Sequence, residues 1–280
     1  MSPTDRPTKA QRREEARQEA LRIRQEQEKA ARRRRTIAIA AAGAILLGFA
    51  VLVAVILSQG GEDDVPEAER IQPSFGSDSR AGIVLDADGI VTPPEDAGDD
   101  WPVGAFGDDV VVVTVYSDPI CPACGLFAAT AGPVLEEMRQ AGEIVVDHRI
   151  VGNLDVYSQG SRYSTRAAQA LYTVAEEAPE SYLAFEEALF AQQPAEGTTG
   201  LTDEEIADIA RQAGVPEAAV TAIGEGRFTW WVGEVTDAAR DRYDGRLLTP
   251  TVLLNGSELA GDVDWRDEAA LRRSIEEARG

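Results

Sequence analysis

A run of β-branched residues that leads directly into a pair of cysteines constrains the fold of this chain most strongly. Residues 110–116 are almost continuously apolar and branched, which is typical of a strand buried on both faces of a sheet. The segment 125–142 behind the cysteines has a helical composition in which Pro133 should kink or break the helix, and residues 143–151 predict a second strand. Strands joined by a crossover of this length pair in parallel. The chain therefore contains a strand–helix–strand unit of an α/β fold.

A series of helices then interrupts the predicted sheet. Helical patterns follow one another over 163–178, 181–192, 202–213, 216–223 and 228–243. A capping box begins at Thr202, and Pro216 suits a first helical position. Strands are further expected at 251–254 and 258–260 and, at an edge, at 82–85, with a last amphipathic helix over 266–279. This order predicts a helical insertion at about 157–245, whose core should hold Trp230 and Trp231.

An uncharged apolar segment lies upstream of these elements. Residues 36–57 are 22 consecutive residues without a charge, and as a helix they would be about 33 Å long, enough to cross a hydrocarbon core of about 30 Å. Their length favours an uncleaved transmembrane helix over a signal peptide or a buried core helix. Four arginines at 32–35 precede the segment and acidic residues follow it, so the C-terminal part should face outward. We expect a cytoplasmic tail (1–35), one transmembrane helix in the cell membrane, a linker (58–80) and a domain (81–280).

Charge is divided unevenly between these parts. Residues 1–35 carry twelve Lys and Arg against six acidic residues, whereas the rest of the chain carries fifteen Arg, no Lys and 43 acidic residues. Such an acidic surface repels a phosphate backbone and offers no basic stripe. We therefore expect no nucleic-acid partner for the C-terminal domain.

The only two cysteines of the chain form the segment Cys121-Pro122-Ala123-Cys124. The predicted strand delivers them to the first turn of a helix, where free N–H groups and partial positive charge stabilise a thiolate, and Pro122 suits the first helical position. We expect Cys121 to be exposed, with a depressed pKa, and Cys124 to lie one turn inward, where it can attack a mixed disulfide on Cys121. This division of labour is thiol–disulfide exchange. An extracytoplasmic location permits disulfides, and any disulfide within the monomer must link this pair.

A proline and the single histidine bear on the site in different ways. Pro250 opens a predicted strand, where a cis Thr249–Pro250 peptide bond is one solution and an ordinary trans proline is the other. His148 lies in the second predicted strand, but two thiols and one distant imidazole do not supply the four ligands of a zinc site. We expect no metal and no cofactor.

Residues 116–127, with the sequence YSDPICPACGLF, resemble the active-site segment of DsbA-like thiol–disulfide oxidoreductases of the thioredoxin superfamily. The segments YSTRAAQAL, FEEALFAQQPAEG and LTPTVLLNG are similar to the membrane-anchored bacterial branch of that family. The similarity extends from about residue 108 to residue 280. It implies a thioredoxin-like fold with an inserted all-helical domain, preceded in this chain by a single transmembrane helix.

The resemblance also assigns roles to residues. It implies that Cys121 is the nucleophile, that Cys124 resolves the mixed disulfide, and that Pro250 is a cis proline lying against the disulfide. Supporting positions are Pro122, Ala123, Thr249 and Asp118.

Two positions depart from the family pattern. Many relatives carry a buried acid, thought to shuttle protons, six residues before the first cysteine, where this chain has Val115. Asp118 is the nearest acid in sequence, with a loop or capping carboxylate as its alternative interpretation. Many strong oxidases also carry a histidine between the cysteines, where it stabilises the thiolate. Ala123 occupies that position here, which implies a milder oxidant.

Three functions stay open at the level of sequence. The resemblance implies a membrane-tethered oxidase that donates its disulfide to thiols of secreted or cell-envelope proteins and is reoxidised by a membrane redox partner. A reductase or isomerase of extracytoplasmic disulfides would use the same residues with electrons running the other way, and Thr249 does not decide between the two. A tethered binding module without redox chemistry is the third, although an intact cysteine pair on an otherwise cysteine-free chain argues against it.

Overall fold

The computed structural model describes residues 70–76, 82–98, 101–107 and 109–279. The predicted cytoplasmic tail, the predicted transmembrane helix 36–57 and most of the predicted linker lie outside these ranges. Within them, no helix combines the length and the apolar character needed to cross a bilayer. All described residues belong to one compact unit, Val65–Gly280.

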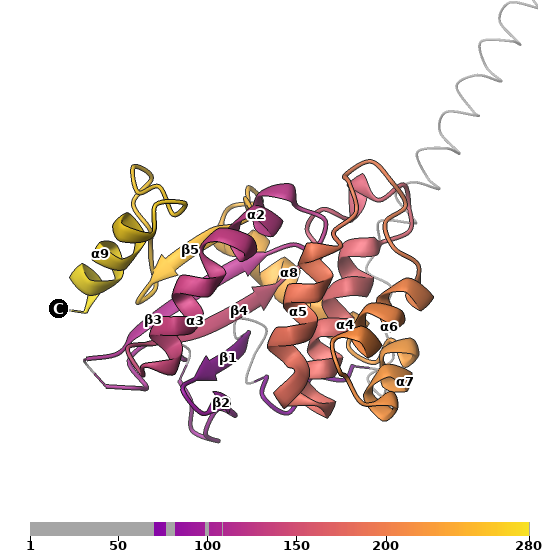
Figure 1. The fold of residues 1–280 in the computed structure, drawn as a ribbon, viewed down its shortest axis with the longest axis horizontal. Helices are drawn as coiled ribbons and strands as arrows, with labels where there is room; N and C mark the ends of the chain where they lie inside the picture. Colours follow the sequence, from indigo (N-terminus) through magenta and orange to yellow (C-terminus); the bar gives the residue numbers. More distant parts are fainter. Residues whose placement is uncertain (1–69, 77–81, 99–100, 108, 280) are drawn as a thin grey trace, which may run out of the picture. The chain divides into compact units, whose positions relative to one another are not determined.

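A mixed sheet forms the centre of this unit (Figure 1). Its strand order is β2-β1-β4-β3-β5-β6. The strands are β1 (Ile83–Asp86), β2 (Gly89–Ile90), β3 (Val111–Ser117), β4 (Ile144–Ile150), β5 (Thr251–Leu254) and β6 (Ser257–Glu258). β3 and β4 pair in parallel, as the crossover predicts, and the other neighbours pair antiparallel. Every residue of β3 is buried, which accounts for its continuous apolar sequence. β1 lies between β2 and β4, so the prediction of an edge strand there is wrong.

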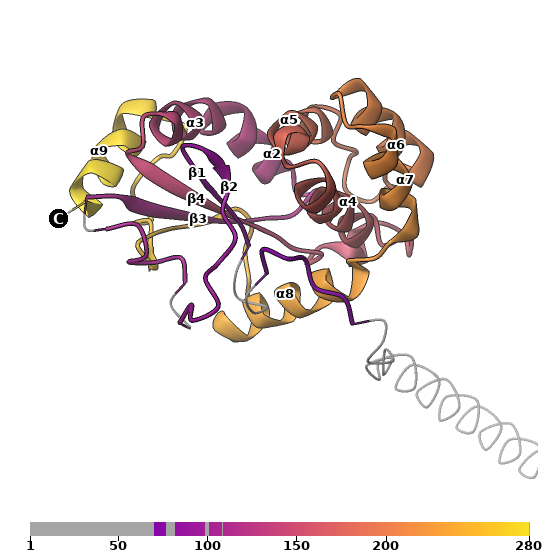
Figure 2. The same cartoon turned by 90° about the horizontal axis from the view of Figure 1, so that it is seen from below.

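Three helices cover one face of the sheet (Figure 2). They are α2 (Pro122–Thr130), α3 (Gly132–Gln140) and α9 (Glu268–Ala278). The break between α2 and α3 falls at Ala131, with Pro133 in the first turn of α3, as predicted. Apolar side chains of this layer, among them Leu135 and Ile275, pack on Val113 and Val115 of β3.

The opposite face and one end of the sheet are covered by the remaining helices. These are α4 (Tyr163–Glu177), α5 (Tyr182–Ala191), α6 (Asp203–Gln212), α7 (Glu217–Glu225) and α8 (Thr229–Arg242). α8 lies beneath the sheet, whereas α4 to α7 gather at its end (Figure 2). One continuous core contains Tyr116 of β3, Phe185 of α5 and Trp231 of α8. The inserted helices therefore share a core with the sheet, and Trp231 and the partly buried Trp230 pack in it as predicted.

Two local features differ from expectation. Pro216 is the N-cap of α7 instead of its first residue, because the helix begins one residue later. Part of the predicted linker belongs to the folded unit: the Phe75 ring stacks on Tyr172 with 6.3 Å between centroids, and Ser74 donates two hydrogen bonds to the Glu176 carboxylate. The capping box at Thr202, in contrast, is confirmed.

Candidate active site

The cysteine pair lies at the junction between the loop that follows β3 and the start of α2. Cys121 is the N-cap of α2, and its carbonyl oxygen accepts hydrogen bonds from the N–H groups of Cys124 (3.0 Å) and Gly125 (3.2 Å). Pro122 is the first helical residue, as predicted, and the exposed Ala123 follows it. The two sulfur atoms therefore lie at the helix N-terminus, where unpaired N–H groups favour negative charge.

Both thiols are free and buried, with 6 % of Cys121 and 1 % of Cys124 exposed. The expectation of an exposed Cys121 is thus wrong, although Cys124 is the deeper of the two. Phe190 and Leu154 pack against the pair, and the Cys121 thiol donates a hydrogen bond to the Thr249 carbonyl oxygen at 3.2 Å. These contacts surround the first sulfur and leave it part-buried, because the sheet and the inserted helices meet at this point.

The two thiols have opposite pKa shifts. The pKa of Cys121 is lowered to about 6, chiefly by a hydrogen bond from the Cys124 side chain, with further hydrogen bonds from the Thr249 side chain and the N–H groups of Cys124 and Ala123 outweighing burial. The pKa of Cys124 is raised well above its ordinary value, first by burial and then by interaction with Cys121. Near neutral pH the negative charge of the pair therefore lies on Cys121, as the sequence predicted.

The Thr249–Pro250 peptide bond is cis, which decides between the two alternatives left by the sequence. It precedes β5, whose first residue, Thr251, lies opposite Tyr116 of β3 in the antiparallel ladder. This register brings Thr249 beside Cys121, so the two sites that are far apart in sequence meet as the resemblance implied.

Asp118 has a more specific environment than the sequence could indicate. Its carboxylate is completely buried and accepts hydrogen bonds from Ile120 N (3.0 Å), Leu154 N (2.8 Å) and Ser164 Oγ (2.6 Å). Its own N–H donates to Cys124 Sγ at 3.4 Å. Burial raises the pKa of Asp118 to about 7 in spite of the three hydrogen bonds. The loop interpretation holds for the bond to Ile120, which precedes α2, whereas α2 has no side-chain cap; neither interpretation accounts for this burial.

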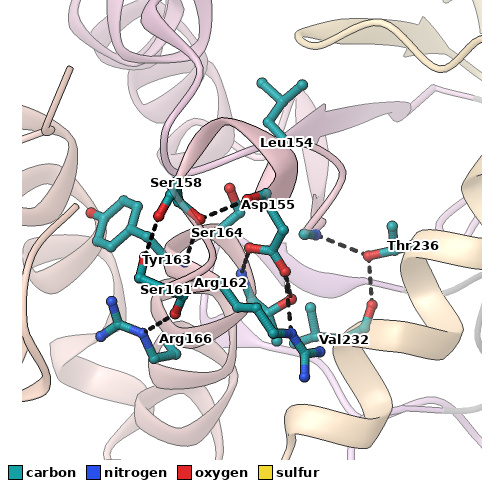
Figure 3. A network of polar contacts seen from close by, with 12 residues as sticks. Leu154, Asp155, Ser158, Ser161, Arg162, Tyr163, Ser164, Arg166, Val232 and Thr236 are labelled. Carbon is teal, nitrogen blue, oxygen red and sulfur yellow. Dashed lines mark hydrogen bonds and ion pairs between the residues drawn. The ribbon is translucent and has the colours of Figure 1, made fainter. Parts of the chain in front are cut away.

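Ser164 belongs to a polar network that holds the start of α4 (Figure 3). The Asp155 carboxylate, from a short 3₁₀ helix, accepts from Thr165 N at 3.0 Å and from Thr165 Oγ1 at 2.6 Å, and Arg162 pairs with it at 3.6 Å. Ser158 Oγ in turn accepts from the N–H of the first residue of α4. This network was not predicted from the sequence, because only folding brings its residues together and they form no recognisable sequence motif.

Exposed apolar side chains flank the pair. Leu248, which is 77 % exposed, immediately precedes Thr249, and Leu126 projects from α2. Val156 and Tyr157, 80 % and 51 % exposed, follow the Leu154 that packs on the cysteines. Four of the five large apolar residues that are exposed in the described unit thus lie on the segments that form the site.

His148 does not join the cysteines. Its Nδ1 lies 2.9 Å from Glu186 Oε1 and 3.0 Å from the Tyr182 hydroxyl, so it links β4 to α5. The site therefore consists of the two thiols, the cis-proline segment and the buried acid.

Known proteins resemble this chain in sequence and fold. Residues 107–276 match the protein family described as thioredoxin. The reduced form of the disulfide bond oxidoreductase DsbG from Mycobacterium tuberculosis is similar with a TM-score of 0.54 and 31 % identity, over 71 % of this chain and 87 % of that chain. Reduced DsbA from the same organism has a TM-score of 0.54 and 29 % identity, over 71 % of this chain and 93 % of that chain.

A part of a larger protein is also similar. The serine/threonine-protein kinase PknE of Mycobacterium tuberculosis is 32 % identical over 118 residues, which are 41 % of this chain and 21 % of the kinase. The chain thus spans about a fifth of the length of that relative.

Proposed function

The chain belongs to the thioredoxin family, as a DsbA-like thiol–disulfide oxidoreductase, and from this premise we propose that it is an oxidase that donates its Cys121–Cys124 disulfide to other proteins. The observation that carries the proposal is the selective stabilisation of the Cys121 thiolate. A stabilised thiolate lowers the free energy of the reduced pair, and this makes the disulfide easier to reduce and therefore a stronger oxidant.

The degree of stabilisation predicts a moderate oxidant. A pKa of about 6 for Cys121 lies between the values of about 7 in thioredoxin and about 3.5 in DsbA. Ala123 agrees with this intermediate value, because it provides no charged or hydrogen-bonding side chain next to the sulfur. The same site could reduce or isomerise disulfides if its potential were lower, so the potential decides the direction.

Oxidation of a client protein proceeds in two exchanges. A client thiolate attacks Cys121 Sγ, the bond to Cys124 breaks, and Cys124 leaves with the electron pair and takes up a proton. A second client thiolate then attacks the client sulfur of the mixed disulfide, and Cys121 leaves as a thiolate. The client loses two electrons and gains a disulfide, while the enzyme pair is reduced. The low pKa of Cys121 makes it the better leaving group in the second exchange.

Asp118 is the group to which we assign the proton of Cys124. The thiolate of Cys124 is disfavoured by burial, so its proton must be exchanged inside the site. A carboxyl with a pKa of about 7 can hold and release a proton at neutral pH. Its residue also contacts the Cys124 sulfur through the backbone N–H. Val115, at the position of the relatives' acid, offers no titratable group.

Clients of this enzyme are unfolded polypeptides with apolar side chains near their thiols. Support comes from the exposed side chains of Leu126, Val156, Tyr157 and Leu248, which lie on the segments that form the site. An extended chain with apolar groups would cover them and gain hydrophobic free energy. We further place the enzyme at the cell membrane, with 36–57 as the span and the domain outside, so that its clients are secreted or cell-envelope proteins and a membrane protein reoxidises it.

The reduction potential of the full-length chain, measured by equilibration with glutathione, tests the direction. We expect a value well above the roughly −270 mV of thioredoxin. A value at or below that level would support the reductase alternative instead.

A pair of variants tests the chemistry. Cys121→Ser should abolish oxidative refolding of a reduced client protein. Cys124→Ser cannot form the internal disulfide, so with glutathione disulfide as the oxidant it should accumulate a mixed disulfide between Cys121 and the client, because no second thiol of the enzyme can resolve it. Full activity of Cys121→Ser in cells would contradict redox catalysis and favour the binding module. Protease protection in intact cells, with release of the domain from outside only, tests the proposed topology.

A further inference from the structure

The side-chain amide of Gln193 connects the inserted helices to the loop that carries the cysteines. Gln193 follows the end of α5, and its Nε2 group donates to the carbonyl oxygens of Pro119 and Cys121, both at 2.9 Å. The backbone N–H of Gln193 donates to the Phe190 carbonyl at 3.2 Å, and the Phe190 ring packs against the cysteine pair. The end of α5 thus contacts the site with one polar and one apolar side chain.

The Cys121 carbonyl oxygen is also the first hydrogen-bond acceptor of α2. It accepts the N–H groups of Cys124 and Gly125 as the first hydrogen bonds of the helix. N–H groups of the same turn, those of Ala123 and Cys124, bond the Cys121 sulfur and favour its thiolate. A donor that holds this carbonyl therefore fixes the turn that stabilises the charge.

Space for the amide depends on the absence of a side chain at Gly125. A Cβ atom placed there would lie 2.6 Å from Gln193 Oε1 and 3.2 Å from its Cδ. The amide is therefore confined between α2 on one side and the two loop carbonyls on the other.

We propose that Gln193 is a positioning residue for disulfide exchange, whose amide holds the first turn of α2 in place and thereby stabilises the Cys121 thiolate. The proposal rests on the proposed function only in taking Cys121 as the reacting thiol. Neither the direction of electron flow nor the cellular location enters it. Because the carbonyl of Pro119 is held by the same amide, the loop and the helix start move together with Gln193.

Titration of Cys121 in the reduced full-length chain, followed by thiolate absorbance, tests this role. In Gln193→Ala we expect the thiol pKa to rise and the glutathione equilibrium constant to shift toward a weaker oxidant by about threefold to tenfold. Gln193→Glu keeps the length of the side chain but loses the donor and adds a negative charge, so its rise should be larger. Gln192→Ala is the matched control, because Gln192 is exposed and adjacent, and it should leave both quantities unchanged.

A double-mutant cycle distinguishes positioning from general stability. Gly125→Ala alone should displace the amide and raise the Cys121 pKa, whereas in the Gln193→Ala background it should add little, because the displaced atoms are gone. Additive effects of the two changes would overturn the proposal. So would a Gln193→Ala variant that unfolds at a lower temperature but titrates like the unchanged protein. Failure of the proposed function would look different: a thioredoxin-like potential, or full activity of Cys121→Ser, with the titration shift of Gln193→Ala intact.

Discussion

At the scale of single residues, Asp118 is a side chain whose protonation near neutral pH is changed by its folded environment. Its pKa of about 7 lies above the ordinary value of 3.8, so between these values the folded chain keeps a proton that the unfolded chain has released. Stability should therefore fall as the pH rises through this window, by up to about 4 kcal/mol in total. Asp118→Asn removes the titration, so urea unfolding at a series of pH values should show a flatter slope in this variant.

Ser164→Ala is a second variant that tests the Asp118 carboxyl. It deletes the hydrogen bond that lowers the pKa of Asp118 most, so the steep part of the stability profile should move to higher pH. In stopped-flow measurements Asp118→Asn should also slow the attack of Cys124 on a mixed disulfide, because the proton acceptor is lost. An unchanged rate and an unchanged pH slope together would remove Asp118 from the mechanism.

A second prediction at the scale of residues concerns Thr249. Its side chain hydrogen-bonds Cys121 and lowers the thiol pKa, while its backbone carbonyl accepts from the same thiol. Thr249→Val keeps the shape and the carbonyl but removes the hydroxyl, so the pKa of Cys121 should rise by about half a unit to one unit. Alkylation of the thiol at pH 6 should be slower in proportion. Thr251→Val serves as the comparison, because the Thr251 hydroxyl donates to Leu248 O and should leave the rate unchanged.

At the scale of secondary-structure elements, α4 begins without a cap of its own. Its N-cap, Arg162, is left-handed with φ of 53° and provides no side-chain cap, and Asp155 accepts the Thr165 N–H in its place (Figure 3). Asp155→Ala should destabilise the fold by about 1–2 kcal/mol in urea unfolding. Asp155→Asn keeps one acceptor and should lose less. Because the Asp155 charge raises the pKa of Asp118, both variants should lower that pKa, and a loss of stability without this shift would contradict the link.

Elements also mark the boundary of what the sequence predicts. β3, the break at Pro133 and the helices from α4 to α8 follow from periodicity, proline and caps, which are local signals. Three features depend on where α4 and α5 lie against the active-site loop. They are the burial of Cys121, the hydrogen bonds of Asp118, and the hydrogen bonds from the Gln193 amide to the loop carbonyls. No spacing in the sequence encodes these contacts. The chemical identity of the pair and the lowered pKa of Cys121 could be predicted from the residues, and the cis peptide bond followed from the family resemblance.

At the scale of the whole molecule, His148 joins the sheet to the helical layer. Its imidazole lies on β4 and pairs with Glu186 of α5, and Tyr182 bonds both groups. Burial lowers the pKa of His148, but Glu186, Asp147 and Glu136 outweigh it and raise the pKa above the ordinary value. The protonated form therefore contributes stability that is complete below the unfolded value of about 6.5 and is lost as the pH rises through the folded value.

The pH dependence of His148 adds to that of Asp118 and to the charge of the chain. Deprotonation of either group destabilises the folded state, and residues 36–280 carry 43 acidic side chains against fifteen arginines, whose repulsion grows as carboxyls ionise. With the Cys121–Cys124 pair oxidised, so that the opposite contribution of the lowered Cys121 pKa is absent, the folded unit should therefore be more stable near pH 5 than near pH 8 in urea unfolding of the full-length chain. Glu186→Gln removes the partner of His148, so it should destabilise the protein more at pH 5.5 than at pH 8, while leaving the titration of Cys121 unchanged. Equal destabilisation at both pH values would show that the pair acts through packing and carries no charge across the two layers.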